Sequence, residues 1–81
     1  MAATREEIYE QVKDVLTDQL GIEASEINEE ANFQEDLDAD SLDLVELIME
    51  LEDSFGVKIS DEDAQKIQTV GQAVDFISSH Q

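Results

Sequence analysis

Between Ser41 and Gly56, apolar residues recur at the spacing of a helix that buries one side. At about 100° per residue, five of them share an arc of roughly 100°. These five are Leu44, Leu47, Ile48, Leu51 and Phe55. Asp40 or Ser41 can cap the start of this helix, and Gly56 tolerates the left-handed backbone that commonly follows a helix end. The segment therefore predicts a helix with one buried stripe.

The same segment carries a second, smaller apolar stripe. Leu42, Val45 and Met49 lie at roughly 160–220° from Leu47, outside the buried arc. The acids that flank this stripe are Glu46, Glu52 and Asp53. One stripe can fold the protein, whereas the other is expected to be exposed within a ring of acids.

A first helix is predicted ahead of this segment. Thr4 and Glu7 form a capping box, and Gly21 is placed to end the helix. The residues on its apolar face are Ile8, Val12, Val15, Leu16 and Leu20. Tyr9 falls off that face, so we expect it to be partly exposed.

Two shorter helices are predicted after the central one. Ser60 is an N-cap followed by acids in the first turn, and this helix runs through Ile67. Thr69 and Gln72 form a further capping box. The inward residues of the last helix are Val70, Ala73, Val74 and Ile77, with Phe76 at the edge. The tail from Ser78 is expected to fray.

Residues 21–39 show no sustained period, which is long for a loop in a compact domain. Four apolar residues are nevertheless spaced as anchors into a core: Ile22, Ile27, Phe33 and Leu37. Ser25 is positioned to cap a brief turn through Ile27. We expect a pinned loop that leads the chain to Ser41.

The charge narrows the possible partners. Twenty-two acids face four bases, for a net charge of −18, and residues 14–57 hold fifteen acids and no Lys or Arg. Such a chain repels the phosphates of nucleic acids and anionic membranes. Basic protein surfaces are the expected partners.

The 81 residues fit one domain, spanning 1–81, and a monomer. With no cysteine, the chain has no disulfide, thiolate metal ligand or cysteine nucleophile. No signal peptide or membrane span is recognisable, so a cytoplasmic protein without membrane insertion is expected.

Asp36, Asp38 and Asp40 match the first ligand positions of a calcium-binding EF-hand loop. The match then fails, because Ser41 stands where glycine is needed and Leu47 where a bidentate glutamate is needed. We therefore expect no metal site.

Ser41 has no predicted means of attacking a substrate. A nucleophilic serine needs a base in hydrogen-bond reach, and the only histidine is His80 in the tail. At a helix N-terminus, however, Ser41 suits a phosphate ester made by another enzyme. The simpler interpretation is that Ser41 only caps the helix.

The residues Asp40-Ser41-Leu42-Asp43 and Val45-Glu46-Leu47-Ile48-Met49 resemble the helix-opening signature of acyl carrier proteins. The resemblance covers nearly the whole chain. Its further matches are Phe33, Glu35-Asp36-Leu37, Leu51-Glu52-Asp53, Phe55, Lys58-Ile59, Asp61-Glu62-Asp63-Ala64, Lys66-Ile67, Thr69-Val70 and Ala73.

The resemblance implies a non-catalytic, all-α four-helix bundle with three longer helices, a short third helix and a long first loop. It implies 4′-phosphopantetheine, from coenzyme A, on Ser41. The implied acyl pocket is lined by Leu47, Leu51, Phe55, Ile59, Ala64 and Ile67. The implied partner face is Asp40, Leu42, Asp43, Val45, Glu46, Met49, Glu52 and Asp53. The implied partners are a phosphopantetheinyl transferase and the acyltransferases, ketoacyl synthases, reductases and dehydratases of fatty acid synthesis.

Three positions depart from the family pattern. Members usually carry glycine where this chain has Asp38, but Asp tolerates a left-handed backbone better than most residues. A common proline near Ser60 is missing, and Glu50 stands where a small residue is frequent. Two alternatives stay open: a carrier for a type II polyketide or other specialised pathway, and an acidic helical adaptor without a prosthetic group.

Overall fold

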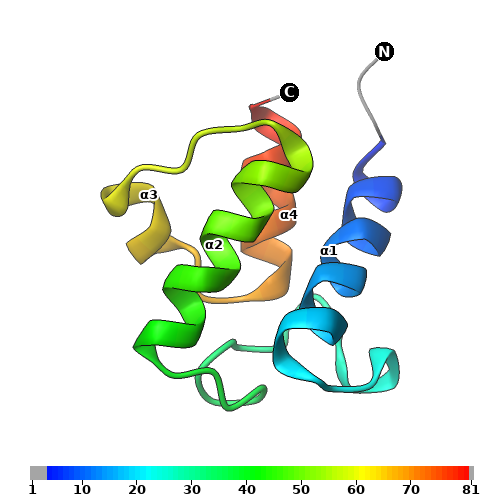
Figure 1. The fold of residues 1–81 in the computed structure, drawn as a ribbon. Helices are drawn as coiled ribbons and strands as arrows, with labels where there is room; N and C mark the ends of the chain where they lie inside the picture. Colours follow the sequence, from blue (N-terminus) through cyan, green and yellow to red (C-terminus); the bar gives the residue numbers. More distant parts are fainter. Residues whose placement is uncertain (1–3, 81) are drawn as a thin grey trace.

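The computed structural model describes residues 4–80. Across them the chain forms four α-helices and one 3₁₀ turn, namely α1 (Arg5–Leu20), η1 (Ala24–Glu26), α2 (Ser41–Phe55), α3 (Asp61–Lys66) and α4 (Val70–Ser79). The expected all-α four-helix bundle with a short third helix is confirmed. In Figure 1, α3 lies beyond α2 on the side away from α1. None of the helices in this range has the length and apolar content needed to cross a membrane.

The predicted helix caps are present. Thr4 Oγ1 accepts a hydrogen bond from the Glu7 N–H at 3.2 Å, and the Glu7 carboxylate accepts one from the Thr4 N–H at 2.9 Å. The return bond from the Thr4 N–H lowers the pKa of Glu7. The corresponding box at α4 and the Ser60 cap at α3 are also formed. Gly21 and Gly56 end their helices in the left-handed conformation, as expected.

One apolar core joins the helices. Its wholly enclosed side chains include Ile8, Val12 and Leu16 of α1, the expected buried face of that helix. They pack with buried residues of α2 and α4, among them Leu47, Leu51, Val70, Val74 and Ile77. Tyr9 is half-buried, with the Lys13 ammonium 5.1 Å from its ring centroid. Sequence periodicity thus identified the inward faces.

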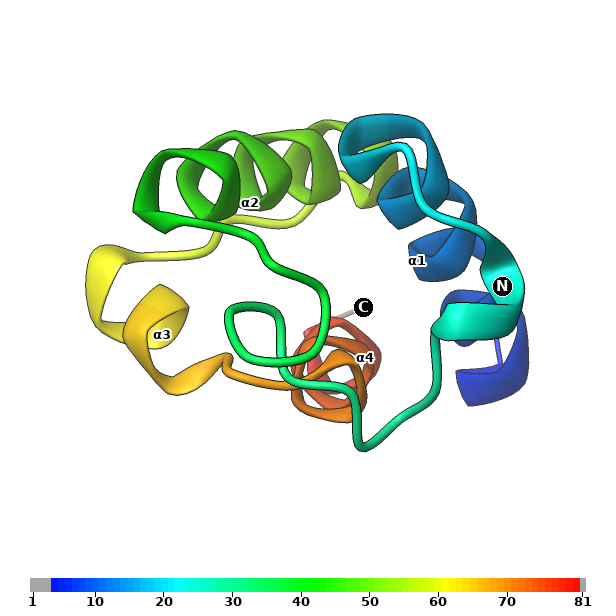
Figure 2. The same cartoon turned by 90° about the horizontal axis from the view of Figure 1, so that it is seen from below.

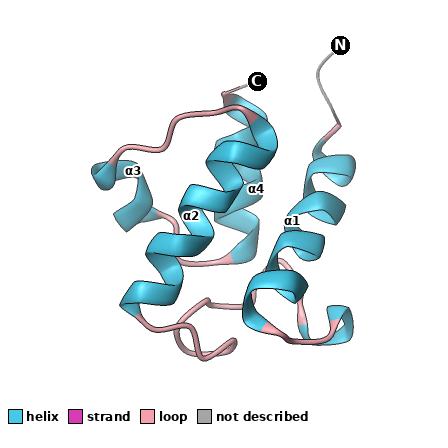
Figure 3. Cartoon of the chain, in the orientation of Figure 1, coloured by secondary structure: helices cyan, strands magenta, loops and turns pink. Residues whose placement is uncertain are grey.

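The long loop from residue 21 to residue 40 is pinned, as expected, and crosses one end of the bundle (Figures 2 and 3). Ile27, Phe33 and Leu37 are buried, and Ile22 is half-buried. Inside the loop, Asn32 organises a turn: its Oδ1 accepts from two following N–H groups at 3.0 Å, and its own N–H donates to Asp36 at 2.8 Å.

The loop is also joined to the segment that leads into α4. The Phe33 N–H donates to the Gln68 carbonyl at 3.0 Å. The Gly71 N–H donates to the Glu29 carbonyl at 2.9 Å, and a Cβ on Gly71 would lie 2.9 Å from that same oxygen. Only glycine allows this approach without a shift of the loop.

Two local predictions were wrong. Ser25 does not cap the brief turn but lies inside it, because η1 begins one residue earlier and the Glu23 N–H is bonded by Glu26 at 3.1 Å. The tail does not fray at Ser78: α4 continues to Ser79. The His80 ring stacks on Phe76 at 4.0 Å between centroids, and its Nδ1 lies 2.8 Å from the Phe76 carbonyl.

An ion-pair cluster ties together three parts of the chain that are distant in sequence. The Arg5 guanidinium at the start of α1 donates to Glu29 in the loop at 2.5 Å and to Asp75 in α4 at 2.7 Å. These bonds raise the pKa of Arg5, and the bond from Arg5 lowers the pKa of Glu29. We call Arg5, Glu29 and Asp75 the Arg5 cluster.

Candidate functional site

Ser41 is the first residue of α2 and is exposed. The chain reaches it through Asp38, the only non-glycine residue with positive φ (57°) in the described range. Buried Ala39 follows, and its N–H donates to the Phe33 carbonyl at 2.8 Å. The left-handed turn expected at Asp38 is therefore present, and it aims the chain into α2.

The helix cap is Asp40, not Ser41. Asp40 Oδ1 accepts from the Asp43 N–H at 2.9 Å, and Asp43 Oδ2 accepts from the Asp40 N–H at 3.4 Å. The hydroxyl of Ser41 takes no part in this box. The N–H groups of Ser41 and Leu42 are not used by it either, so the site can accommodate a phosphate ester.

Ser41 has no histidine beside it in the described structure. The only histidine, His80, is stacked on Phe76 at the end of α4 and does not line the cavity beside Ser41. The charged residue that does line that cavity is Asp61. A carboxylate there opposes formation of an alkoxide, so the site suits a serine modified by another enzyme.

The EF-hand interpretation has no structural support. Asp36 is bonded to the Asn32 N–H, and Asp40 caps α2. Within residues 4–80, no three carboxylate or imidazole groups are arranged to hold a metal ion.

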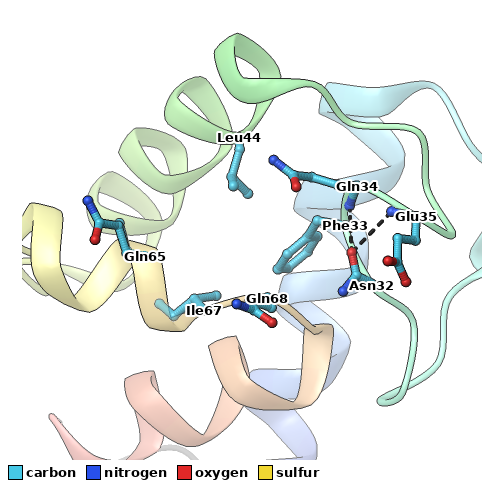
Figure 4. Close-up of a pocket in the computed structure, with 9 residues that line it drawn as sticks. Asn32, Phe33, Gln34, Glu35, Leu44, Gln65, Ile67 and Gln68 are labelled. Atoms are coloured by element: carbon cyan, nitrogen blue, oxygen red, sulfur yellow. Dashed lines mark hydrogen bonds between the residues drawn. The ribbon is translucent and has the colours of Figure 1, made fainter.

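Two adjoining cavities lie beside α2 and α3. The first, of about 360 Å³, is lined by Asn32, Phe33, Gln34, Glu35, Leu44, Ala64, Gln65, Ile67 and Gln68 (Figure 4). The second, of about 460 Å³, is more open and is lined by Gln34, Ser41, Leu44, Val45, Ile48, Asp61, Ala64 and Gln65. Their volumes are in the range of small-molecule sites, about 300–1,000 Å³. Ser41 thus stands at the edge of a space that continues between the helices.

The expected acyl-pocket residues divide into two groups. Ala64 and Ile67 line the first cavity. The other four are not walls of either cavity: Leu47, Leu51 and Ile59 are buried in the core, and Phe55 is half-buried at the end of α2. Sequence reasoning missed Gln34, Leu44, Gln65 and Gln68 as walls. The one signal in the sequence that could have indicated these walls was Leu44, which lies in the apolar stripe of α2 and is half-buried.

The second apolar stripe of α2 is exposed, as predicted. Leu42, Val45 and Met49 are 68%, 56% and 60% exposed. Asp40, Glu46 and Asp53 are exposed around them, whereas Asp43 and Glu52 are half-buried. Glu52 is also engaged, because its carboxylate accepts from the Ile59 N–H at 3.0 Å. The face is apolar at its centre and acidic at its rim.

Comparison with known proteins agrees with this arrangement. Residues 10–77 match the family described as phosphopantetheine attachment site. The acyl carrier protein of Rubrobacter xylanophilus is 57% identical over 77 residues, covering 95% of each chain. That of Lactobacillus johnsonii is 53% identical over 78 residues, covering 96% of this chain and 98% of that protein. A solved structure of the acyl carrier protein from Enterococcus faecalis has a TM-score of 0.82 at 47% identity, covering 98% of this chain and 100% of that one.

The bundle and the attachment-site match define a carrier of a prosthetic group rather than a catalyst. The chain belongs to the acyl carrier protein family. The group that its attachment-site family holds is phosphopantetheine.

Proposed function

We propose that Ser41 carries the 4′-phosphopantetheine and that the chain, as one domain and a monomer, shuttles acyl intermediates of fatty acid synthesis. The observation that carries this proposal is the position of Ser41. Its exposed hydroxyl is outside the cap of α2 and borders a cavity that leads between α2 and α3.

The bound group would supply a thiol, which holds acyl chains as thioesters and which this cysteine-free chain lacks. The chain's own residues provide the rest. The unpaired N–H groups at the start of α2 favour the phosphate through the helix dipole. Leu44, Ala64 and Ile67 offer apolar walls to an acyl chain.

The exposed face of α2 is proposed as the surface that partners bind. Leu42, Val45 and Met49 would contact an apolar patch on each enzyme. Asp40, Glu46 and Asp53 would meet basic residues around it, which mainly speeds association. The proposed partners are the transferase that loads Ser41 and the acyltransferases, ketoacyl synthases, reductases and dehydratases of fatty acid synthesis.

Attachment is tested by intact mass after incubation with coenzyme A, magnesium and a broad-specificity phosphopantetheinyl transferase. The wild type should gain one phosphopantetheine, and Ser41→Ala should gain none. Ser54→Ala, which removes another exposed serine of α2, is the matched control and should load normally. Modification of Ser41→Ala, or a folded wild type that never gains mass, would overturn the assignment.

The pathway needs a separate experiment. The loaded chain is given to the purified enzymes of a dissociated fatty acid synthase, and successive two-carbon extensions are followed by mass. Full elongation cycles support fatty acid synthesis. Loading without elongation, together with acceptance by a polyketide ketosynthase, would move the chain to a specialised pathway.

A further inference from the structure

Three glutamine side chains stand around the first cavity. Gln34 comes from the long loop, Gln65 from α3, and Gln68 from the segment that leads into α4. We call them the amide rim. In Figure 4 the carboxamide of Gln34 extends past the ring of Phe33 toward Leu44. The cavity, whose walls also include Asn32 and Glu35, is therefore bordered by three neutral groups that both donate and accept hydrogen bonds.

Backbone hydrogen bonds position the residues of the amide rim, whereas their side-chain carboxamides make no hydrogen bond within the described residues. The Gln34 N–H donates to Asn32 at 3.0 Å, and the Gln68 carbonyl accepts from the Phe33 N–H at 3.0 Å. By contrast, the hydrogen bonds found within residues 4–80 leave all three carboxamides unengaged. These amides are positioned by the fold and available to a ligand.

The amide rim is also continuous with Ser41. Gln34, Leu44, Ala64 and Gln65 line both cavities, and Ser41 borders the second. A group attached to Ser41 that enters the first cavity from this side passes between Gln34 and Gln65. Asp61 also borders the second cavity, but the polar side chains that line both cavities are the carboxamides of Gln34 and Gln65.

We propose that the amide rim, with Gln34 as its main member, makes this chain retain acyl groups that bear a neutral oxygen near the thioester, such as 3-hydroxyacyl groups. This inference rests on the proposed attachment at Ser41. A hydroxyl that leaves water needs a hydrogen-bond partner, and a carboxamide supplies one. An anionic acyl group would instead face the carboxylates of Glu35 and Asp61. The selected class is therefore polar but uncharged.

The test compares two acyl groups of equal length on the same chain. Octanoyl and 3-hydroxyoctanoyl groups are loaded on Ser41 from their coenzyme A thioesters, and loading is confirmed by mass. The rate of thioester cleavage by hydroxylamine is then measured. The rate for the same acyl group on free coenzyme A is divided by this rate. This ratio reports how well the fold shelters each acyl group, independently of any enzyme.

The variants are Gln34→Leu and Gln65→Leu, with Gln19→Leu on the exposed surface of α1 as the matched control. Removal of one neutral hydrogen bond should reduce protection of the 3-hydroxyoctanoyl group on the order of three- to tenfold. Protection of the octanoyl group should be unchanged or higher, and Gln19→Leu should match the wild type. In the wild type, the side-chain amide signals of Gln34 should shift in ¹H–¹⁵N spectra with the hydroxylated group only.

Equal effects of Gln34→Leu on both acyl groups, or none on either, would overturn the inference. If Gln34→Leu does not fold, Gln65→Leu and the amide shifts decide by the same criteria. Absence of any mass increment on Ser41 would overturn the inference and the proposed function together. Normal loading with unselective protection would overturn the inference alone.

Discussion

The carboxylate of Glu52 in α2 accepts a hydrogen bond from the backbone N–H of Ile59 at 3.0 Å. Ile59 lies in the connector to α3, so this bond fixes how the chain leaves α2 and approaches the cavities. Glu52 was expected at the rim of the partner face. Its position indicates a structural role as well.

We therefore expect Glu52→Ala to destabilise the fold. Hydrogen bonds to charged groups contribute about 1.5–3 kcal/mol, and the half-exposed position reduces this to about 1–2 kcal/mol. The midpoint of thermal unfolding should fall by roughly 4–8 °C per kcal/mol in a domain of this size. Asp53→Ala, at the exposed neighbour, is the control and should not lower it. Equal behaviour of the two variants would contradict the role given to Glu52.

Asp38 supports a second prediction about stability. Its φ of 57° costs an ordinary L-residue roughly 1–2 kcal/mol, and glycine avoids this cost. Asp38→Gly should raise the free energy of unfolding by about 0.5–1 kcal/mol in urea titrations, after the entropy cost of glycine is subtracted. Asp38→Ala should lower it. Asp38→Asn separates the effect of the negative charge on stability from the effect of the backbone conformation, because Asn tolerates the same conformation without the charge. A stabilising Asp38→Ala would refute the backbone explanation.

The Arg5 cluster predicts that the stability of the variant Arg5→Gln, relative to the wild type, depends on pH. In the folded chain the pKa of Glu29 is below its usual value of 4.5, chiefly through the bond from Arg5. A carboxylate with a lowered pKa stabilises the fold above its usual pKa, and this contribution is lost as the pH falls through the lowered value. Arg5→Gln should therefore melt below the wild type at pH 7, and the difference should close below pH 4.5.

Lys13→Gln is the control for the Arg5 cluster, because it removes the same charge. Its pair with Glu10, at 3.6 Å, joins residues of one helix and links no separate elements. If Lys13→Gln lowers the melting temperature as much as Arg5→Gln, the effect is due to net charge and not to the cluster.

Self-repulsion should weaken this fold at neutral pH. A net charge of −18 on 81 residues favours the expanded chain, and salt screens this repulsion. Thermal melts at pH 7 should shift to higher temperature with added sodium chloride, and further with magnesium at equal ionic strength. Mild acid should act in the same direction until the Arg5 cluster is lost. A melting temperature that does not change with salt or pH would contradict this expectation.

The proposed partner face is tested by kinetics rather than by stability. Met49→Ala removes an exposed apolar centre, and Glu46→Lys reverses a rim charge. Both should slow acyl transfer to a ketoacyl synthase, the second mainly at low salt, while the melting temperature stays near that of the wild type. Asp18→Lys on α1 makes the same charge change away from this face and should transfer normally. Unchanged transfer in both α2 variants would remove this surface from the proposal.

Local signals were sufficient to predict most of the fold. The cap at Thr4 and Glu7, and the glycine that ends α2, involve neighbours in sequence. Phe33 was recognised as an anchor because the apolar residues of the loop are spaced as anchors into a core. The turn at Asp38 followed from the family resemblance.

The features that were not predicted depend on how separate elements meet. Asn32 organises its loop through five hydrogen bonds of its backbone and side chain, an arrangement that no spacing rule identifies. The bond from Ile59 to Glu52 requires the connector to double back on α2. The cavity walls at Gln34 and Gln65 depend on where α3 lies, and α3 buries none of its own residues.

Because Asp40 and Asp43 cap α2 between themselves, the hydroxyl of Ser41 is dispensable to the helix. If Ser41 is esterified as proposed, the hydrogen bonds that cap α2 are the same before and after loading. An enzyme can then recognise the protein through the exposed face of α2, and it detects the loading state through the attached group. Binding of the protein surface and detection of the attached group are thereby separate events. A modification at Ser41 can then be detected without a change in the conformation of the protein.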